Sequence, residues 1–367
     1  MIIRGGQVFQ EDGTYRKQDI YIEDHKIVSS REEVTEAKVI DARGLKVIPG
    51  LIDIHSHGAV GCDFSDGSVT GLKKILRYQK ACGVTSFCPT TMTLPAKKLL
   101  QVMESAFMAG AEEDQAAIAG INMEGPFLDP AKRGAHREEF IVPPDVDLFR
   151  KCQEACKGKI RLVTLAPNVK GADRFLEEVK GEVTVSLGHT DADYENAKSA
   201  FDRGASHVTH LYNAMAPFRH RTPGLVGAAF DSPHVMAELI ADGIHVHPSV
   251  VRSTFAMFGR DRVILISDST MAAGMEDGMY RLGGQDVTVR RGKAQLADGT
   301  IAGSAVNLFE CMKRAVRFGI KEEDAILAST VNPAKRIGIF DKVGSITPGK
   351  KADLLLLDQE LNLLQVL

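Results

Sequence analysis

The chain has 367 residues, of which 44% are hydrophobic and 25% are charged, so it can bury one large core or two smaller ones. Its net charge of -3 and its pI of about 6.4 exclude a strong overall attraction to nucleic acid or to anionic membranes. No stretch approaches the ~20 apolar residues of a membrane span, and no charged leader precedes an apolar segment at the N-terminus. We expect a cytoplasmic globular protein.

The six cysteines point to the same compartment. They lack a C-x-x-C pair and the density of a disulfide framework, so we interpret them as free thiols in a reducing environment. They stand at positions 62, 82, 88, 152, 156 and 311.

Short strand-like runs separated by turns fill both ends of the chain. The runs near the N-terminus cover residues 2–8, 19–23, 26–29, 37–41 and 45–48. After residue 343 the same style returns, with runs over 352–357 and 361–367. We predict one small, discontinuous β-sandwich domain built from residues 1–48 and 344–367.

Residues 49–343 alternate apolar strands with amphipathic helices such as 96–109, 172–179, 193–203 and 249–258. Eight strands favour a closed parallel (β/α)8 TIM-like barrel, and the alternative of an open doubly wound sheet lacks its Gly-x-Gly-x-x-Gly fingerprint. Glycine-punctuated runs near 280–301 predict a β-hairpin insertion. The expected barrel strands are 51–55, 84–89, 117–124, 160–166, 183–189, 207–210, 236–241 and 263–268.

Histidines and carboxylates recur where the expected barrel strands end. Because the ends of parallel strands meet at one rim, these side chains are expected to gather there and to form a nitrogen and oxygen cage for a metal such as zinc or iron(II). His207 faces the other side of its short strand from His210, and we interpret it as structural. The residues at the strand ends are His55, His57, Glu124, His189, His210 and Asp268.

The order of these motifs resembles the amidohydrolase superfamily over essentially the whole chain, and within it the deacetylases of phosphorylated amino sugars. The resemblance implies a metal-dependent hydrolase that releases acetate from N-acetyl-D-glucosamine 6-phosphate in amino-sugar metabolism. It also implies one further strand after residue 367, so the terminal sheet is expected to be incomplete or short. The motifs that carry the resemblance lie at 49–58, 123–127, 132–136, 188–190, 210–215, 221–225, 242–245, 267–268 and 302–304.

The resemblance assigns the principal divalent metal to Glu124, His189 and His210. With both His55 and His57 present, a second metal bridged through Glu124 is expected, so that one or two ions bind per subunit. A bound ion activates water and polarises the amide carbonyl.

Asp268 is expected to accept the proton of the water and then to deliver it to the departing nitrogen. By resemblance His136 lies over the substrate, where it hydrogen-bonds either the carbonyl oxygen or a sugar hydroxyl.

The resemblance also implies how substrate is held. The phosphate site is expected to use Asn213, Ala214, Arg221 and His245, because a guanidinium suits phosphate oxygens. Part of that site reaches in from a neighbouring subunit, which implies a homodimer. The sugar is expected to contact Ala135, His136, Ile301, Ala302 and Gly303.

Two other functions stay open. A different metal-dependent amidohydrolase, acting on a cyclic amide or another N-acylated substrate, is the nearest alternative, although the fourth expected strand lacks the lysine that bridges two metals in such enzymes. A non-catalytic scaffold that kept the barrel is the other, and the intact Asp268 and ligand set argue against it.

Overall fold

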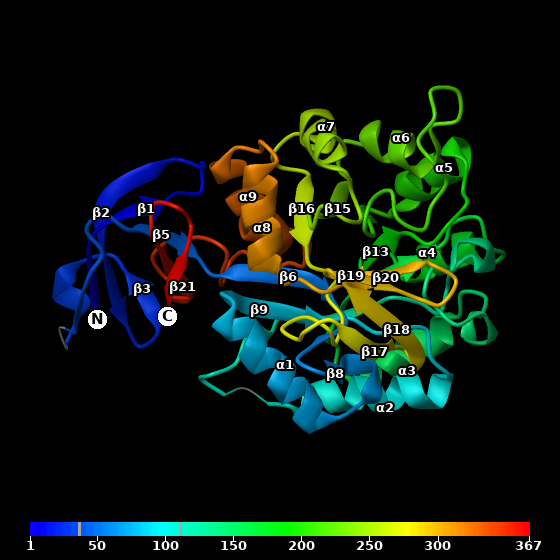
Figure 1. Ribbon diagram of the computed structural model, residues 1–367, viewed down its shortest axis with the longest axis horizontal. Coiled ribbons are helices and arrows are strands. Elements are labelled where there is room, and N and C mark those ends of the chain that lie inside the picture. Colours follow the sequence, from blue (N-terminus) through cyan, green and yellow to red (C-terminus); the bar gives the residue numbers. More distant parts are fainter. Residues whose placement is uncertain (36–37, 111) are drawn as a thin grey trace.

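In the computed structural model, which describes residues 1–35, 38–110 and 112–367, both ends of the chain enter one seven-stranded sheet. The strands run in the order β22, β21, β5, β1, β2, β3, with β4 paired to β1, and both termini lie in this part of the molecule (Figure 1). The run expected over 37–41 starts at a position outside the described residues. The second sheet of a sandwich stays a prediction. The strands are β1 (Ile2–Phe9), β2 (Tyr15–Glu23), β3 (Lys26–Val28), β4 (Val39–Asp41), β5 (Lys46–Pro49), β21 (Leu354–Leu357) and β22 (Leu363–Val366).

The middle of the chain forms a curled set of parallel strands. They are hydrogen-bonded as two sheets, in the orders β10-β9-β6 and β11-β12-β13-β14-β15-β16. Main-chain hydrogen bonds cross both seams: Thr91 N donates to Asn122 O over 3.0 Å, and Asp268 N donates to His55 O over 2.9 Å. The strands are β6 (Leu51–Ser56), β9 (Val84–Pro89), β10 (Ala117–Ile118), β11 (Ile121–Met123), β12 (Ile160–Leu165), β13 (Thr184–Leu187), β14 (His207–Val208), β15 (Met236–Ile240) and β16 (Val263–Ile266).

Helices connect these strands and cover their outer side (Figure 1). Several begin at side-chain caps, as where Asp193 accepts from the Asn196 main chain, because the first N–H groups of a helix lack partners within it. The helices are α1 (Val69–Ala81), α2 (Ala96–Met108), α3 (Val146–Ala155), α4 (Ala172–Glu178), α5 (Tyr194–Arg203), α6 (Gly224–Phe230), α7 (Pro248–Phe258), α8 (Leu308–Arg317), α9 (Glu322–Ser329) and α10 (Val331–Arg336). The short elements are β7 (Gly58–Ala59), β8 (Cys62–Asp63), η1 (Arg31–Glu33), η2 (Phe64–Asp66), η3 (Pro130–Lys132) and η4 (Glu138–Phe140).

The segment expected to form a hairpin lies in a four-stranded antiparallel sheet of order β17-β18-β19-β20. Its last strand returns to the barrel, where Ser304 N donates to Asp268 O over 2.8 Å. The added sheet therefore lies against the turn that carries Asp268. The strands are β17 (Gly278–Leu282), β18 (Gln285–Arg290), β19 (Lys293–Gln295) and β20 (Ile301–Ser304).

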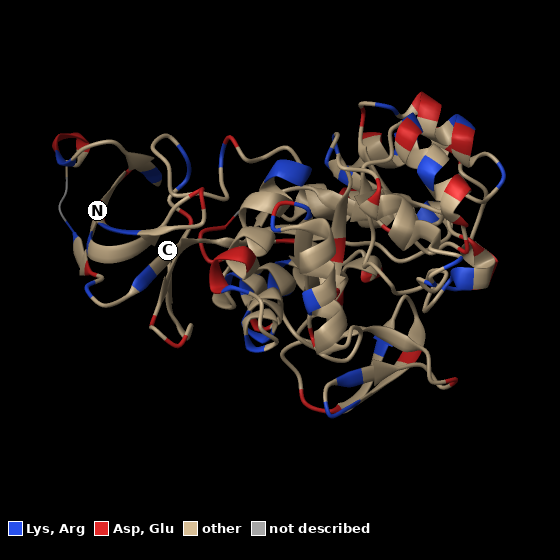
Figure 2. Ribbon diagram, turned by 90° about the horizontal axis from the view of Figure 1, so that it is seen from above, with Lys and Arg blue, Asp and Glu red and all other residues tan. Residues whose placement is uncertain are grey.

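The outer surface carries acidic and basic residues side by side on helices and loops, in keeping with the small net charge (Figure 2). Within the part of the chain that the structure describes, no helix combines the length and apolar character that a bilayer crossing requires. All six cysteines are free thiols, and four of them are buried.

Candidate metal centre and active site

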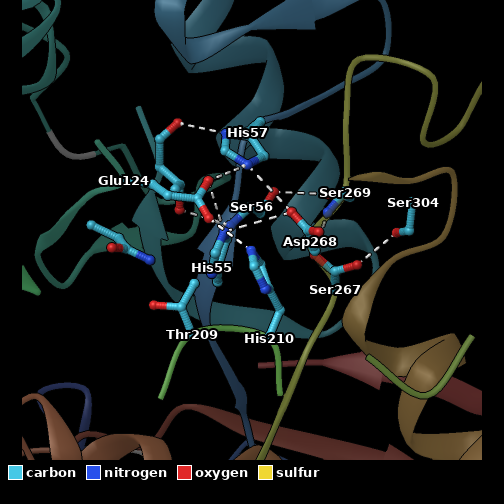
Figure 3. A network of polar contacts seen from close by, with 12 residues as sticks. His55, Ser56, His57, Glu124, Thr209, His210, Ser267, Asp268, Ser269 and Ser304 are labelled. Carbon is cyan, nitrogen blue, oxygen red and sulfur yellow. Dashed lines mark hydrogen bonds and ion pairs between the residues drawn. The ribbon is translucent and has the colours of Figure 1, made fainter. Parts of the chain in front are cut away.

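The ends of the parallel strands carry the predicted polar side chains into one buried cluster (Figure 3). Directly after their strands, His189, His210 and Asp268 have φ angles of 47°, 26° and 46°. Such left-handed conformations are costly for residues with a side chain, and they persist where the surrounding structure enforces them. In the cluster, the His189 and His210 side chains contact Glu124, and the Asp268 side chain contacts His57.

Glu124 is the centre of this cluster and is only 1% exposed. Its Oε1 atom lies 3.2 Å from His189 Nε2 and 3.0 Å from His210 Nε2. Its Oε2 atom lies 3.4 Å from His55 Nε2 and 3.2 Å from His57 Nε2. One carboxylate thus divides four imidazoles into two pairs, with one oxygen toward each pair.

Two of the four imidazoles, those of His57 and His189, have main-chain partners that favour the tautomer a metal requires. Main-chain oxygens accept from Nδ1 of His57 and of His189, at 3.2 Å from Thr90 O and 2.9 Å from Lys132 O. In the neutral ring, a proton on Nδ1 leaves the lone pair on Nε2, which faces Glu124.

His55 provides a further test of fit. Its Nδ1 atom donates to Glu238 Oε2 over 2.8 Å, and its buried Nε2 atom has no hydrogen-bond partner among the described residues. An unpartnered buried nitrogen beside a carboxylate is costly unless a cation binds there. The donor set of imidazole nitrogens and carboxylate oxygens therefore fits zinc or iron(II).

Asp268 completes the second pair. Its Oδ1 atom lies 3.3 Å from His57 Nε2 and 3.6 Å from His55 Nε2. Burial raises the pKa of Asp268, but the hydrogen bond from His57 and the nearby imidazoles outweigh burial and leave that pKa below its usual value. Asp268 is therefore ionised at neutral pH and can accept a proton.

The same balance acts on its neighbours. Burial raises the pKa of Glu124, yet the charge of His55 and the hydrogen bonds from the imidazoles lower it well below the usual value. Burial lowers the pKa of His57, and the hydrogen bonds to Asp268 and Glu124 reverse this and raise the pKa to about 9. The carboxylates of Glu124 and Asp268 thus favour positive charge within the cluster, on an imidazole or on a bound cation.

His136 approaches the same centre in a different tautomer. Thr93 N donates to His136 Nδ1 over 3.1 Å, so the proton of neutral His136 is on Nε2, which lies 3.4 Å from Glu124 Oε2. Burial lowers the pKa of His136 to about 4. Glu124, His136 and His189 lie close enough to hold an ion together, but a protonated Nε2 makes His136 a hydrogen-bond donor rather than a ligand.

A cavity of about 300 Å³ opens beside this centre. In its wall, His245 Nδ1 lies 2.7 Å from Asp242 Oδ2. Burial lowers the pKa of His245, and the hydrogen bond and charge of Asp242 outweigh it and raise that pKa above the usual value. This part of the cavity thus favours the protonated, cationic form of His245, which suits an anionic ligand.

Most predicted site residues meet at this cavity. Three predicted residues are not among the described residues that line it: His55 and Ala302 are fully buried, and Arg221 is exposed on a loop. The predicted residues in the lining are His57, Glu124, Ala135, His136, His189, His210, Asn213, Ala214, His245, Asp268, Ile301 and Gly303.

Several residues of the site escaped the sequence analysis. Met92 and Leu282 form apolar wall, and nothing in their sequence context distinguishes them from core residues. Glu238, by contrast, gave a signal. A carboxylate within the apolar run of β15 is unusual in a buried strand, and it lies 3.1 Å from His207 Nε2.

Comparison with known proteins agrees with this geometry. The model of the amidohydrolase family matches residues 46–366, and the chain belongs to that family, whose members depend on metals.

Within it, the chain is 39% identical to the N-acetylglucosamine-6-phosphate deacetylase of Bacillus subtilis, over 98% of this chain and 93% of that protein. It is 32% identical to the N-acetylgalactosamine-6-phosphate deacetylase of Escherichia coli O157:H7, over 100% and 97% of the two chains. A mutant of the Mycobacterium smegmatis N-acetyl-D-glucosamine-6-phosphate deacetylase, solved in complex with N-acetyl-D-glucosamine-6-phosphate, superposes with a TM-score of 0.91 at 30% identity, covering 100% of this chain and 97% of that one. The resemblance predicted from the motifs is confirmed, and these relatives are hydrolases.

Proposed function

We propose that the protein hydrolyses the acetamide of N-acetyl-D-glucosamine 6-phosphate to D-glucosamine 6-phosphate and acetate, using one or two ions of zinc or iron(II). The observation that carries the proposal is the division of four imidazoles between the two oxygens of Glu124, with Asp268 beside one pair. The identity to deacetylases over nearly the whole chain supports the choice of substrate.

In the proposed reaction, Glu124, His189 and His210 would hold the principal ion, and His55 and His57, together with Glu124, would hold a second one. A bound divalent ion lowers the pKa of coordinated water and polarises a carbonyl group. Ionised Asp268 accepts a proton from the attacking water and returns it to the sugar nitrogen as the C–N bond breaks.

His136 is suited to stabilise the charge that develops on the carbonyl oxygen. The Thr93 main chain fixes its Nε2 proton toward the reacting centre, and its low pKa keeps the ring neutral. A donor that is already oriented needs no reorganisation when the oxyanion forms.

Substrate selection is proposed to depend on a group of residues that line the cavity. Cationic His245, with Asn213 and Ala214, is proposed to bind the 6-phosphate. Arg221 is proposed to complete that site from the loop of a second subunit, which requires a homodimer. The closed form of the barrel and the cytoplasmic location stay predictions.

The test is a panel assay of acetate release by purified protein with zinc, iron(II), manganese or cobalt. The substrates are the 6-phosphates of N-acetylglucosamine, N-acetylgalactosamine and N-acetylmannosamine, and unphosphorylated N-acetylglucosamine as the control. We expect metal-dependent release that is fastest with N-acetylglucosamine 6-phosphate. Preference for the galactosamine compound would change the assigned sugar, and no release from any of them would overturn the function.

A further inference from the structure

Glu238 is a buried carboxylate that the proposed reaction does not use. It lies in β15 between Ala237 and Leu239 and is fully inaccessible to solvent. A carboxylate in such an apolar strand is strongly disfavoured unless its oxygens are satisfied by hydrogen bonds. Its partners therefore indicate why the strand contains it.

The two oxygens of Glu238 face different partners. Oε2 accepts from His55 Nδ1 over 2.8 Å and from the His210 main-chain N over 3.1 Å. Oε1 lies 3.1 Å from His207 Nε2. One oxygen is thus devoted to the two proposed metal-binding histidines, and the other to a histidine outside the cavity.

The Oε2 contacts act on both halves of the centre. The contact to His55 places the proton on Nδ1 and aims the lone pair of Nε2 at Glu124 Oε2, 3.4 Å away. The contact to His210 holds a main chain whose φ of 26° is strained. Figure 3 shows that the His55 and His210 rings lie next to each other below Glu124.

We propose that Glu238 is a positioning residue that sets the tautomer of His55 and anchors the His210 turn, and thereby sets metal affinity at the Glu124 centre. The proposal rests on the proposed function, because it concerns the ion that this function requires. Carboxylates that orient metal-binding histidines typically change metal affinity by about 10- to 100-fold when they are removed.

The experiment compares E238A with H207A in the full-length protein. H207A is the matched control because it removes a partner of the same buried carboxylate but leaves the contacts to His55 and His210 in place. Zinc affinity is measured by competition with a chromophoric chelator, zinc content by elemental analysis, and unfolding temperature by calorimetry of the zinc-free proteins.

We expect E238A to bind zinc about 10- to 100-fold more weakly than wild type and H207A to stay within about twofold of it. A purely structural role would lower the unfolding temperature of both variants and leave zinc affinity alike in both. That result, or wild-type affinity in E238A, would overturn the proposal.

Two further measurements distinguish a misfolded variant, and a failure of the proposed function, from a failure of the proposed role of Glu238. If E238A does not fold, long-range ¹H–¹⁵N NMR of the wild-type histidines decides, because the proposal requires the His55 proton on Nδ1, and a proton on Nε2 would overturn it. If wild type itself neither binds zinc nor releases acetate, the proposed function fails. If wild type does both and E238A binds zinc equally well, only the role of Glu238 fails.

Discussion

The proposed reaction end and the proposed phosphate end of the cavity are built in different ways. At the reaction end, hydrogen bonds from within the chain orient His55, His57, His136 and His189. At the phosphate end, His245 has such a partner in Asp242, whereas Arg221 lies on an exposed loop away from the cavity.

This difference indicates a division of labour. Metal binding and proton transfer need side chains fixed to within a fraction of an ångström, and buried strand ends provide that precision. Phosphate binding tolerates a long cation from a loop, so it can be completed by a second subunit. The following variants separate these two contributions.

The largest effect is expected for D268N, which removes the proton acceptor but preserves shape. Turnover should fall about 10²- to 10⁴-fold while the fold and metal content are retained. Steady-state kinetics with elemental analysis measures this, and D286N, which changes an exposed acidic residue of β18, is the control. Near-normal turnover would remove Asp268 from the mechanism.

A smaller effect is expected for H136A. Loss of one oriented donor to a developing oxyanion should lower kcat about 10²- to 10³-fold, with metal content unchanged because His136 is not a ligand. Loss of metal together with activity would instead assign His136 to the metal site, with Glu124 and His189.

The phosphate end is tested by R221A, with R219A of the same exposed loop as the control. Loss of a charge-assisted hydrogen bond of about 1.5–3 kcal/mol should raise KM for the phosphorylated sugar about 10- to 100-fold. Activity on unphosphorylated N-acetylglucosamine should not change. Equal losses on both substrates would refute the phosphate role.

Mixing R221A and D268N chains tests whether Arg221 acts across a subunit interface. If Arg221 acts across a subunit interface, a mixed dimer contains one site with both Arg221 and Asp268 intact. Activity on the phosphorylated sugar should then rise above that of either variant alone. Simple averaging of the two activities would place Arg221 in its own subunit's site or outside the site altogether.

The smallest effect is a shift in pH dependence for D242N. Asp242 raises the pKa of His245, and the protonated imidazole binds phosphate, so binding is strong below that pKa and is lost as pH rises through it. Without the carboxylate the pKa falls, and KM should begin to rise at a lower pH than in wild type. Unchanged KM profiles would show that the charge of His245 does not bind substrate.

The residues proposed for the reaction end lie together in the structure, whereas Arg221 lies outside the cavity lining, and the reason is physical. His55, Glu124, His189 and Asp268 stand at strand ends, and parallel strands bring their ends together whatever the intervening loops do. Arg221 lies on an exposed loop, and local periodicity carries no information about where a loop places its side chains.

The fold shows the same limit. Apolar runs located the parallel strands between β6 and β16, but the glycine-punctuated segment near 280–301 suggested a hairpin where the structure has a four-stranded sheet. Ser304 ends β20 by pairing with Lys293, and the next helix begins at Leu308. Glu238 was not predicted as a site residue, because its proposed role depends on contacts with His55 and His210, which are distant in the sequence.

Anomalous diffraction at the zinc edge from crystals of zinc-replete protein tests the central claim most directly. We expect an ion about 2.0–2.2 Å from Glu124 Oε1, His189 Nε2 and His210 Nε2, and at full occupancy a second ion beside Glu124 Oε2, His55 and His57. Zinc bound elsewhere, with Glu124 coordinating none, would contradict the account.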